Sequence, residues 1–140
     1  MSEVFNAYAQ YYDLIYQEKD YKAETQYVVD LLRSNALNGS HFLEMGCGTG
    51  VHSEYLSRLG FDVMGVDRSE SMLKQAKDRK RYLSDKFSKK LSYELSDIKS
   101  FNTKFTFDAV LSLFHVISYQ TENTDLYAVF NTANRHLKKG

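Results

Sequence analysis

The sequence predicts an α/β fold, in which a parallel sheet is flanked by helices and preceded by a helical extension. From residue 41 onward, short apolar segments alternate with amphipathic segments, as in parallel strands joined by right-handed crossovers. The run 107–114 is almost continuously apolar, as expected of a central strand covered on both faces. Hydrophobic residues make up 43% of the 140-residue chain, enough for one domain with a buried core.

Residues 1–40 are predicted to form an N-terminal helical cap, separate from a domain at 41–140. Its apolar stripe consists of Val28, Val29, Leu31 and Leu32, and the segment 35–39 ends that helix. Tyrosines are crowded in this region, at Tyr8, Tyr11, Tyr12, Tyr16 and Tyr21.

The first strand is predicted at 41–45 and leads into a glycine cluster at 46–50. A helix follows, ends at Gly60, and should turn four side chains inward: Val51, Tyr55, Leu56 and Leu59. The second strand is predicted at 62–67.

Ser69 is predicted to cap the next helix, with Glu70 in its first turn, where a negative charge suits the helix dipole. Strands at 91–95 and 107–114 follow, and the last helix should begin within 121–124. Two sets of side chains are expected inside these helices: Met72, Leu73, Ala76 and Leu83 in the first, and Leu126, Val129, Phe130 and Leu137 in the last.

Charge and composition argue against several partners. The chain has 18 basic and 18 acidic residues, so no global charge attracts nucleic acid or an anionic membrane. The segment 74–90 holds eight basic and two acidic residues, which indicates a solvated helix face or a patch for a phosphorylated substrate or RNA. With one cysteine, no apolar run near ~20 residues and no visible signal peptide, a cytoplasmic location is expected.

The glycine cluster has the spacing Glu44-x-Gly46-x-Gly48-x-Gly50. Glycines between a strand and a helix let a ligand approach the main chain closely. A dinucleotide fingerprint would place its third glycine one residue later, and an acid before the loop would repel a pyrophosphate. Glu44 instead suits an ammonium group and a sulfonium centre, so a nicotinamide-dependent oxidoreductase is disfavoured.

Two further acids follow the next strands in order. Asp67 ends the second strand, where a carboxylate can accept hydrogen bonds from ribose hydroxyls. Asp97 follows the third strand and can accept a bond from an adenine amine. Helix capping by Asp67 and a turn at Asp97 are the structural alternatives. Ligands of open parallel sheets bind at the carboxyl ends of the strands, where all three acids are expected to gather.

The runs 42–50, 65–67, 96–98 and 107–113 together resemble the class I S-adenosylmethionine-dependent methyltransferases, which have a Rossmann-like fold. The resemblance implies that Glu44 and the loop hold the methionine part of the cofactor, Asp67 the ribose, and Asp97 with Ile98 the adenine. The full predicted cofactor site comprises Tyr16, Tyr21, Glu44, Gly46, Cys47, Gly48, Gly50, Asp67, Arg68, Met72, Asp97, Ile98 and Leu113.

A narrower resemblance concerns the N-terminal segment. The run 12–16, the run 19–21 and Glu24 are similar to the entry helices of enzymes that N-methylate nucleotide-linked amino sugars, and also of other small-molecule methyltransferases. In the sugar enzymes N-terminal tyrosines fold over the cofactor, which makes Tyr16 and Tyr21 the candidates here. The methyl acceptor is thus expected to be a small molecule, with nitrogen, oxygen and carbon acceptors all left open.

Methyl transfer requires positioning of the nucleophile and exclusion of water, and a base where the acceptor must lose a proton. His115 follows the fourth strand beside the expected methyl group and is one candidate base; Tyr119 is the other. A structural role is the alternative for His115. His52 and His136 are assigned no role, and no spacing indicates a metal site.

The family's sheet has seven strands, whereas four are predicted here, so the domain at 41–140 is expected to be incomplete at its C-terminus. A non-catalytic cofactor-binding fragment or an interaction domain is therefore the alternative function. The strand 107–114 would have an unpaired edge, through which two chains are expected to associate.

Overall fold

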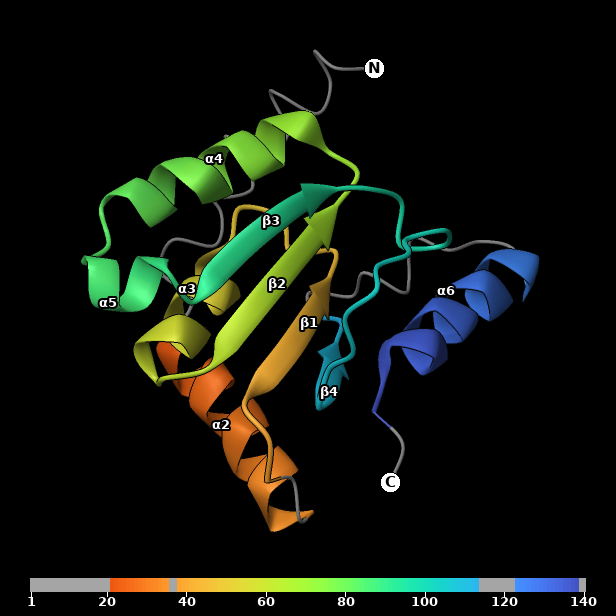
Figure 1. Ribbon diagram of the computed structural model, residues 1–140, viewed down its shortest axis with the longest axis horizontal. Helices are drawn as coiled ribbons and strands as arrows, with labels where there is room; N and C mark the ends of the chain where they lie inside the picture. The colour runs from red at the N-terminus through yellow and green to blue at the C-terminus, as the bar shows by residue number, and fades with distance from the viewer. Residues whose placement is uncertain (1–20, 36–37, 114–122, 139–140) are drawn as a thin grey trace.

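A computed structural model of the chain describes residues 21–35, 38–113 and 123–138. One sheet contains four strands, β1 (His41–Met45), β2 (Asp62–Asp67), β3 (Leu91–Leu95) and β4 (Ala109–Leu111). Every neighbouring pair is parallel and the order is β3-β2-β1-β4, so β1 lies in the interior of the sheet (Figure 1). The predicted fold class is confirmed, as are the bounds of the first three strands.

Helices cover both faces of this sheet. α2 (Tyr21–Ser34), α3 (Val51–Arg58) and α4 (Glu70–Arg81) lie on one face, and α6 (Asn123–His136) lies on the other (Figure 1). The core is divided in the same way, because Phe42 packs in a cluster with Leu56 of α3, whereas its neighbour Leu43 packs in a cluster with Val129 of α6. A one-turn helix, α5 (Asp85–Ser88), was not predicted.

Two predicted helix ends are confirmed. The Oγ atom of Ser69 accepts a hydrogen bond from the Met72 amide at 3.3 Å and caps α4. After α3, the Gly60 amide donates to the Ser57 carbonyl at 3.0 Å and the Phe61 amide donates to the Leu56 carbonyl at 3.1 Å. This pair of bonds is a Schellman motif, and it is accompanied by the burial of both Phe61 and Leu56 in the core.

Several predicted inward positions are wrong. Leu31, Leu59 and Phe130 are 50%, 45% and 57% exposed, and Leu137, which follows α6, is also exposed. Leu59 caps the end of α3, where the chain turns away from the sheet. Tyr55 is only half-buried. The side chain of Leu126 lies outside the described residues.

Polar side chains occupy the inner faces instead. His52, Ser53 and Ser57 are buried on α3, and Thr132 and His136 are buried on α6. His136 has partners on both ring nitrogens: Nδ1 lies 2.6 Å from the Thr132 carbonyl and Nε2 lies 3.1 Å from the Thr103 amide. The neutral tautomer with a proton on Nδ1 satisfies both bonds, which permits the burial of this ring.

The fourth strand is shorter than predicted. Among the described residues 107–113 of this run, only Ala109–Leu111 pair with β1, and Phe107 forms an isolated bridge with Leu137. Between them, the Asp108 carboxylate accepts hydrogen bonds from the Ser40 and His41 amides, each at 3.0 Å. The side chain of Asp108 therefore binds the start of β1.

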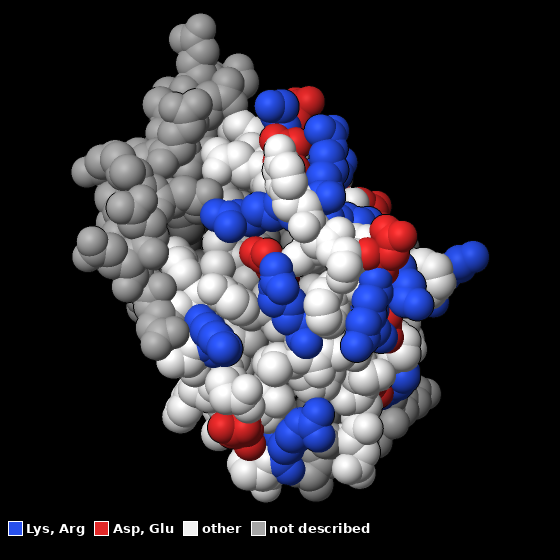
Figure 2. Space-filling model, turned by 90° about the vertical axis from the view of Figure 1, so that its left-hand side faces the viewer, with Lys and Arg blue, Asp and Glu red and all other residues white. Residues whose placement is uncertain are grey.

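The basic segment 74–90 forms most of α4 and all of α5. Figure 2 shows basic side chains interspersed with acidic and uncharged ones on this side of the molecule. Arg79 pairs with Glu54 at 3.8 Å, Arg81 with Asp78 at 3.6 Å, and the Lys80 amine donates to the Leu91 carbonyl at 2.7 Å. These contacts favour the interpretation as a solvated helix face. No described helix has the length and apolarity of a membrane-spanning segment.

Candidate functional site

Glu44, the loop 46–50, Asp67 and Asp97 lie at or just after the carboxyl ends of three adjacent strands. β1, β2 and β3 are parallel neighbours, so their carboxyl ends form one rim of the sheet (Figure 1). The Ser96 amide donates to the Asp67 carbonyl at 2.9 Å, which holds the segment after β3 against the end of β2. The three acids are thus on the same rim, where open α/β sheets bind their ligands.

The loop between β1 and α3 turns at its three glycines. Gly46, Gly48 and Gly50 have φ angles of 72°, 57° and 81°, in the left-handed region that favours glycine. The amides of Gly46 and Cys47 both donate to the Val66 carbonyl, at 2.7 and 3.0 Å. No side chain caps α3 at Gly50, so the helix begins at the loop itself.

Asp67 fixes this loop. Its Oδ2 atom accepts a hydrogen bond from the Gly48 amide at 2.9 Å, and its Oδ1 atom accepts one from the Ser69 amide at 2.8 Å. Burial raises the pKa of Asp67, and these two amides with the charge of Arg68 oppose that rise. Each carboxylate oxygen retains a lone pair, so the group can also accept from two hydroxyls of a ligand.

Glu44 is a carboxyl group in the interior of the protein. It is 1% exposed, and the Ser53 hydroxyl donates to its Oε2 atom at 2.6 Å. Burial raises the pKa of Glu44 to about 7, the bond from Ser53 opposes this rise, and the nearby charge of Asp67 adds to it. No basic side chain in the described part of the chain pairs with Glu44, so the group is suited to a cationic ligand.

The other predicted site residues differ in burial. Met72 is buried, and a Cβ placed on Gly48 would lie 3.5 Å from its sulfur. Cys47 is also buried, and burial raises the pKa of its thiol, so it remains neutral. Arg68 is exposed beside Asp67, and Leu113 is half-buried after β4.

Asp97 and Ile98 are both near the rim, with different surroundings. The Oδ1 atom of Asp97 accepts from the Lys99 amide at 2.9 Å, which forms a local turn. The Ile98 side chain is buried in the core cluster on the α6 face. Of these two side chains, the carboxylate of Asp97 is the one that is available at the rim, because Ile98 is buried.

Tyr21, the first residue of α2, packs against the start of α3. Its ring packs edge-on against His52 with 5.3 Å between centroids, and His52 Nε2 lies 3.1 Å from a carboxylate oxygen of Glu24. His52 follows the glycine loop by two residues, so this contact joins α2 to the region of that loop. The predicted residues Tyr16, His115 and Tyr119 lie outside the described part of the chain.

Two residues of the site were missed from the sequence. Ser53 contacts Glu44 directly, and Tyr93 lies over Gly65 with its hydroxyl next to Gly50. The alternation of Leu91 and Tyr93 indicates that Tyr93 faces inward. Its contact with the loop depends on strand register, which the sequence pattern leaves undefined.

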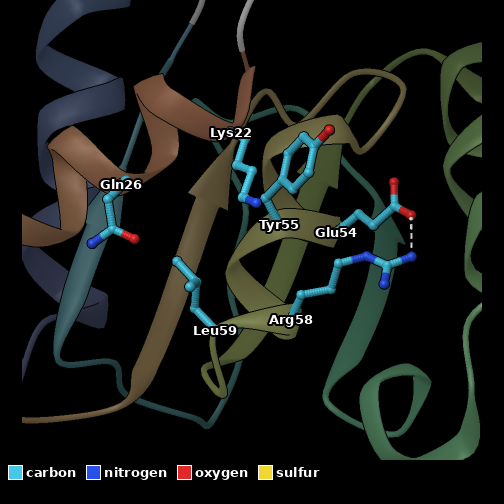
Figure 3. Close-up of a pocket in the computed structure, with 6 residues that line it drawn as sticks. All are labelled: Lys22, Gln26, Glu54, Tyr55, Arg58 and Leu59. Atoms are coloured by element: carbon cyan, nitrogen blue, oxygen red, sulfur yellow. Dashed lines mark hydrogen bonds and ion pairs between the residues drawn. The ribbon is translucent and has the colours of Figure 1, made fainter.

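A pocket of about 610 Å³ lies between α2 and α3 (Figure 3). Its lining consists of Lys22, Gln26, Glu54, Tyr55, Arg58 and Leu59, none of which belongs to the predicted site. Two of these lining residues, Arg58 and Glu54, form an ion pair at 3.3 Å. Within the described ranges, no group of three or more His, Cys, Asp or Glu side chains is arranged to hold a metal ion.

The sheet order, the glycine loop and the acidic rim define an α/β protein of the Rossmann-like class with a ligand site at its strand ends. Residues 42–140 match the family described as "Methyltransferase domain". The chain belongs to this methyltransferase family.

Several relatives and solved structures are similar to the chain. The dTDP-3-amino-3,4,6-trideoxy-alpha-D-glucopyranose N,N-dimethyltransferase of Streptomyces venezuelae is 33% identical over 95% of this chain and 54% of its own length. The crystal structure of DesVI from the same species matches with a TM-score of 0.81 and 33% identity over 94% of this chain and 53% of that chain.

A third similar protein is CalS10 of Micromonospora echinaspora, an amino pentose methyltransferase solved with S-adenosylmethionine bound. It matches with a TM-score of 0.80 and 27% identity over 92% of this chain and 52% of that chain. The chain spans about half the length of these relatives.

Proposed function

We propose that this chain is the cofactor-binding portion of an S-adenosylmethionine-dependent methyltransferase. The observation that carries the proposal is the buried Glu44, which has no basic partner among the described residues and lies at the same rim as Asp67 and the glycine loop. S-adenosylmethionine has an ammonium group, a sulfonium centre and two ribose hydroxyls, which match these two carboxylates in charge and hydrogen bonding.

Each residue then has a defined part in binding. Glu44 and the loop amides hold the amino-acid end, Asp67 accepts from the ribose, and Asp97 with the Ile98 backbone borders the adenine. Met72 packs near the adenosine, and Cys47, Arg68, Leu113, Tyr16 and Tyr21 complete the predicted site. The cofactor supplies a methyl group that is already activated, so the protein chiefly orients the acceptor and excludes water.

The proposed acceptor is a small molecule, and specifically an amino sugar linked to a nucleoside diphosphate. Two curated relatives that match along 95% of this chain are named as dimethyltransferases of dTDP-linked amino sugars. His115 and Tyr119 are the proposed bases that take the proton from the acceptor. The division into a cap at 1–40 and a domain at 41–140, and a cytoplasmic location, also stay predictions.

Association of two chains through the sheet edge is a further part of this proposal. β4 is the terminal strand in the sheet order, with three residues paired to β1. Light scattering at high protein concentration tests it, since a monomer under those conditions contradicts the association.

Titration with S-adenosylhomocysteine and with NAD tests the cofactor assignment. We expect binding of S-adenosylhomocysteine and none of NAD. Asp67→Ala should weaken the binding by about tenfold or more, since hydrogen bonds to a charged acceptor are lost. Asp62→Ala, at the opposite end of the same strand, is the matched control and should leave the affinity unchanged. Equal affinities of the unaltered chain and Asp67→Ala would remove Asp67 from the site.

Turnover distinguishes an enzyme from a binding or interaction domain. The full-length parent protein should transfer labelled methyl groups to a dTDP-amino sugar. Cofactor binding without transfer to any small amine, hydroxyl or carbon acceptor would favour the non-catalytic alternative.

A further inference from the structure

Tyr93 reaches across the sheet toward the proposed cofactor loop. It pairs in register with Gly65 of β2, and Gly65 pairs with Glu44 of β1, so the three residues form one row. A Cβ on Gly65 would lie 2.7 Å from Cδ1 of Tyr93 and 2.8 Å from the sulfur of Cys47. The absence of a side chain at Gly65 therefore provides the space in which the Tyr93 ring lies.

The Tyr93 hydroxyl ends beneath the last glycine of the loop. A Cβ on Gly50 would be 2.6 Å from this oxygen. The oxygen is fully buried and has no hydrogen-bond partner among the described residues. Buried tyrosine hydroxyls usually have a partner, so an unpaired one next to a ligand-binding loop calls for an explanation.

The groups around this hydroxyl come from three elements. Cys47 comes from the loop, Glu44 from β1, and Ser53 and Glu54 from α3. Burial is the main reason that the pKa of Tyr93 is raised, so its hydroxyl stays protonated and can act as a donor. Ser53 already donates its own proton to Glu44, which leaves the Ser53 oxygen free to accept one.

We propose that Tyr93 is a positioning residue for Glu44, whose hydroxyl donates to Ser53 Oγ in the ligand-bound site and holds the Ser53–Glu44 bond in place. This inference rests on the proposed function, because Glu44 must be the acceptor for a cationic amino group. The donor chain runs from Tyr93 to Ser53 to Glu44 and ends on the carboxylate. A chain of hydrogen bonds in this direction stabilises the charged form of Glu44, which is the form that binds a cation.

The polar and titratable groups around Glu44 set the expected pH dependence. The hydrogen bond from Ser53 on α3 favours the charged carboxylate, whereas the charge of Asp67 on β2 disfavours it. The thiol of Cys47 in the loop stays neutral. Affinity for S-adenosylhomocysteine should therefore rise with pH as Glu44 loses its proton. Removal of the Tyr93 hydroxyl should displace that rise to higher pH.

Tyr93→Phe tests the proposal with the ring retained. Calorimetric titration with S-adenosylhomocysteine between pH 6 and 8.5 should show about 3- to 10-fold weaker binding at pH 7 and a profile displaced to higher pH. Tyr82→Phe, at a tyrosine that is 90% exposed, is the matched control and should reproduce the unaltered profile. Thermal unfolding verifies that both variants are folded. If Tyr93 has a purely structural role, the pH profile of Tyr93→Phe will match that of the unaltered chain, and this result would overturn the inference.

A double-mutant cycle tests the route through Ser53. Ser53→Ala should weaken binding, and adding Tyr93→Phe to it should cause no further loss, because the donor would have no acceptor. Additive losses would overturn a route through Ser53. The two proposals fail separately: no S-adenosylhomocysteine binding by the unaltered chain refutes the proposed function, whereas binding with an identical Tyr93→Phe profile refutes only this inference.

Discussion

The buried carboxyl group of Glu44 should destabilise the ligand-free protein at neutral and alkaline pH. Folding raises the pKa of this group from 4.5 to about 7, chiefly because burial penalises its charge. The folded chain therefore binds this proton more tightly than the unfolded chain does. Stability from the protonated group is fully present below pH 4.5 and is lost as the pH rises to about 7.

Glu44→Gln removes this titration and keeps the shape of the side chain. A difference between pKa values of 4.5 and about 7 corresponds to about 3 kcal/mol in the free energy of unfolding. Glutamine can still accept from Ser53 through its carbonyl oxygen, and any cost of burying its amide is independent of pH. As the pH rises from 4.5 to 8, the free energy of unfolding of the variant should therefore increase by about 3 kcal/mol relative to that of the unaltered chain.

Urea unfolding followed by circular dichroism at several pH values measures this difference, and it suits a chain without tryptophan. Glu94→Gln is the matched control, since Glu94 also lies on a strand of the sheet but is exposed. Its profile should run parallel to that of the unaltered chain. Parallel profiles for Glu44→Gln as well would refute the argument that Glu44 is buried at a cost. The same variant should bind S-adenosylhomocysteine more weakly, as expected where function opposes stability.

Two further predictions concern the support of the sheet. Burial raises the pKa of Asp108, but the amides at the start of β1 and the Lys138 amine outweigh it and leave the pKa below its ordinary value. The stabilisation by the ionised Asp108 carboxylate is therefore lost as the pH falls below about 4. Asp108→Asn should lower the free energy of unfolding by about 1–3 kcal/mol at pH 7 and by less in acid. An equal loss at both pH values would contradict this. Gly65→Ala should cost about 1–3 kcal/mol in urea unfolding, because its Cβ overlaps the Tyr93 ring, and an unchanged midpoint would refute that packing.

The regular part of the fold was predictable because its signals are local. Strands at 41–45, 62–67 and 91–95 are bounded by glycines or polar residues, and Ser69 caps α4 through its own hydroxyl. The fourth strand was predicted too long because Phe107 and Asp108 belong to the same run of residues as β4. Phe107 forms only a single bridge with Leu137, and Asp108 binds the amides of Ser40 and His41 through its side chain. Apolarity alone does not distinguish a ladder position from a single bridge.

The inner faces of the helices were predicted less well, for a different reason. Hydrophobic periodicity assigns burial to leucine and phenylalanine, and it placed Leu59 and Phe130 inside. The structure buries His52, Ser53 and His136 instead, each of which has a hydrogen-bond partner from a distant segment or its own helix. Such burial depends on partners that only the folded chain brings together.

The acids of the rim were predictable, whereas their support was not. Glu44 and Asp67 follow from their positions at strand ends. Ser53 reaches Glu44 through the packing of α3 on the sheet, and Tyr93 reaches the glycine loop through the register of β3 on β2. Gly65 illustrates the distinction: in the sequence it is an ordinary glycine in a strand, and in the sheet it is the space that admits the Tyr93 ring. The residues proposed to contact a ligand are thus specified by motif, and the residues proposed to tune them are specified by packing. A variant series limited to the motif would leave Ser53 and Tyr93, and with them the charge state of Glu44, untested.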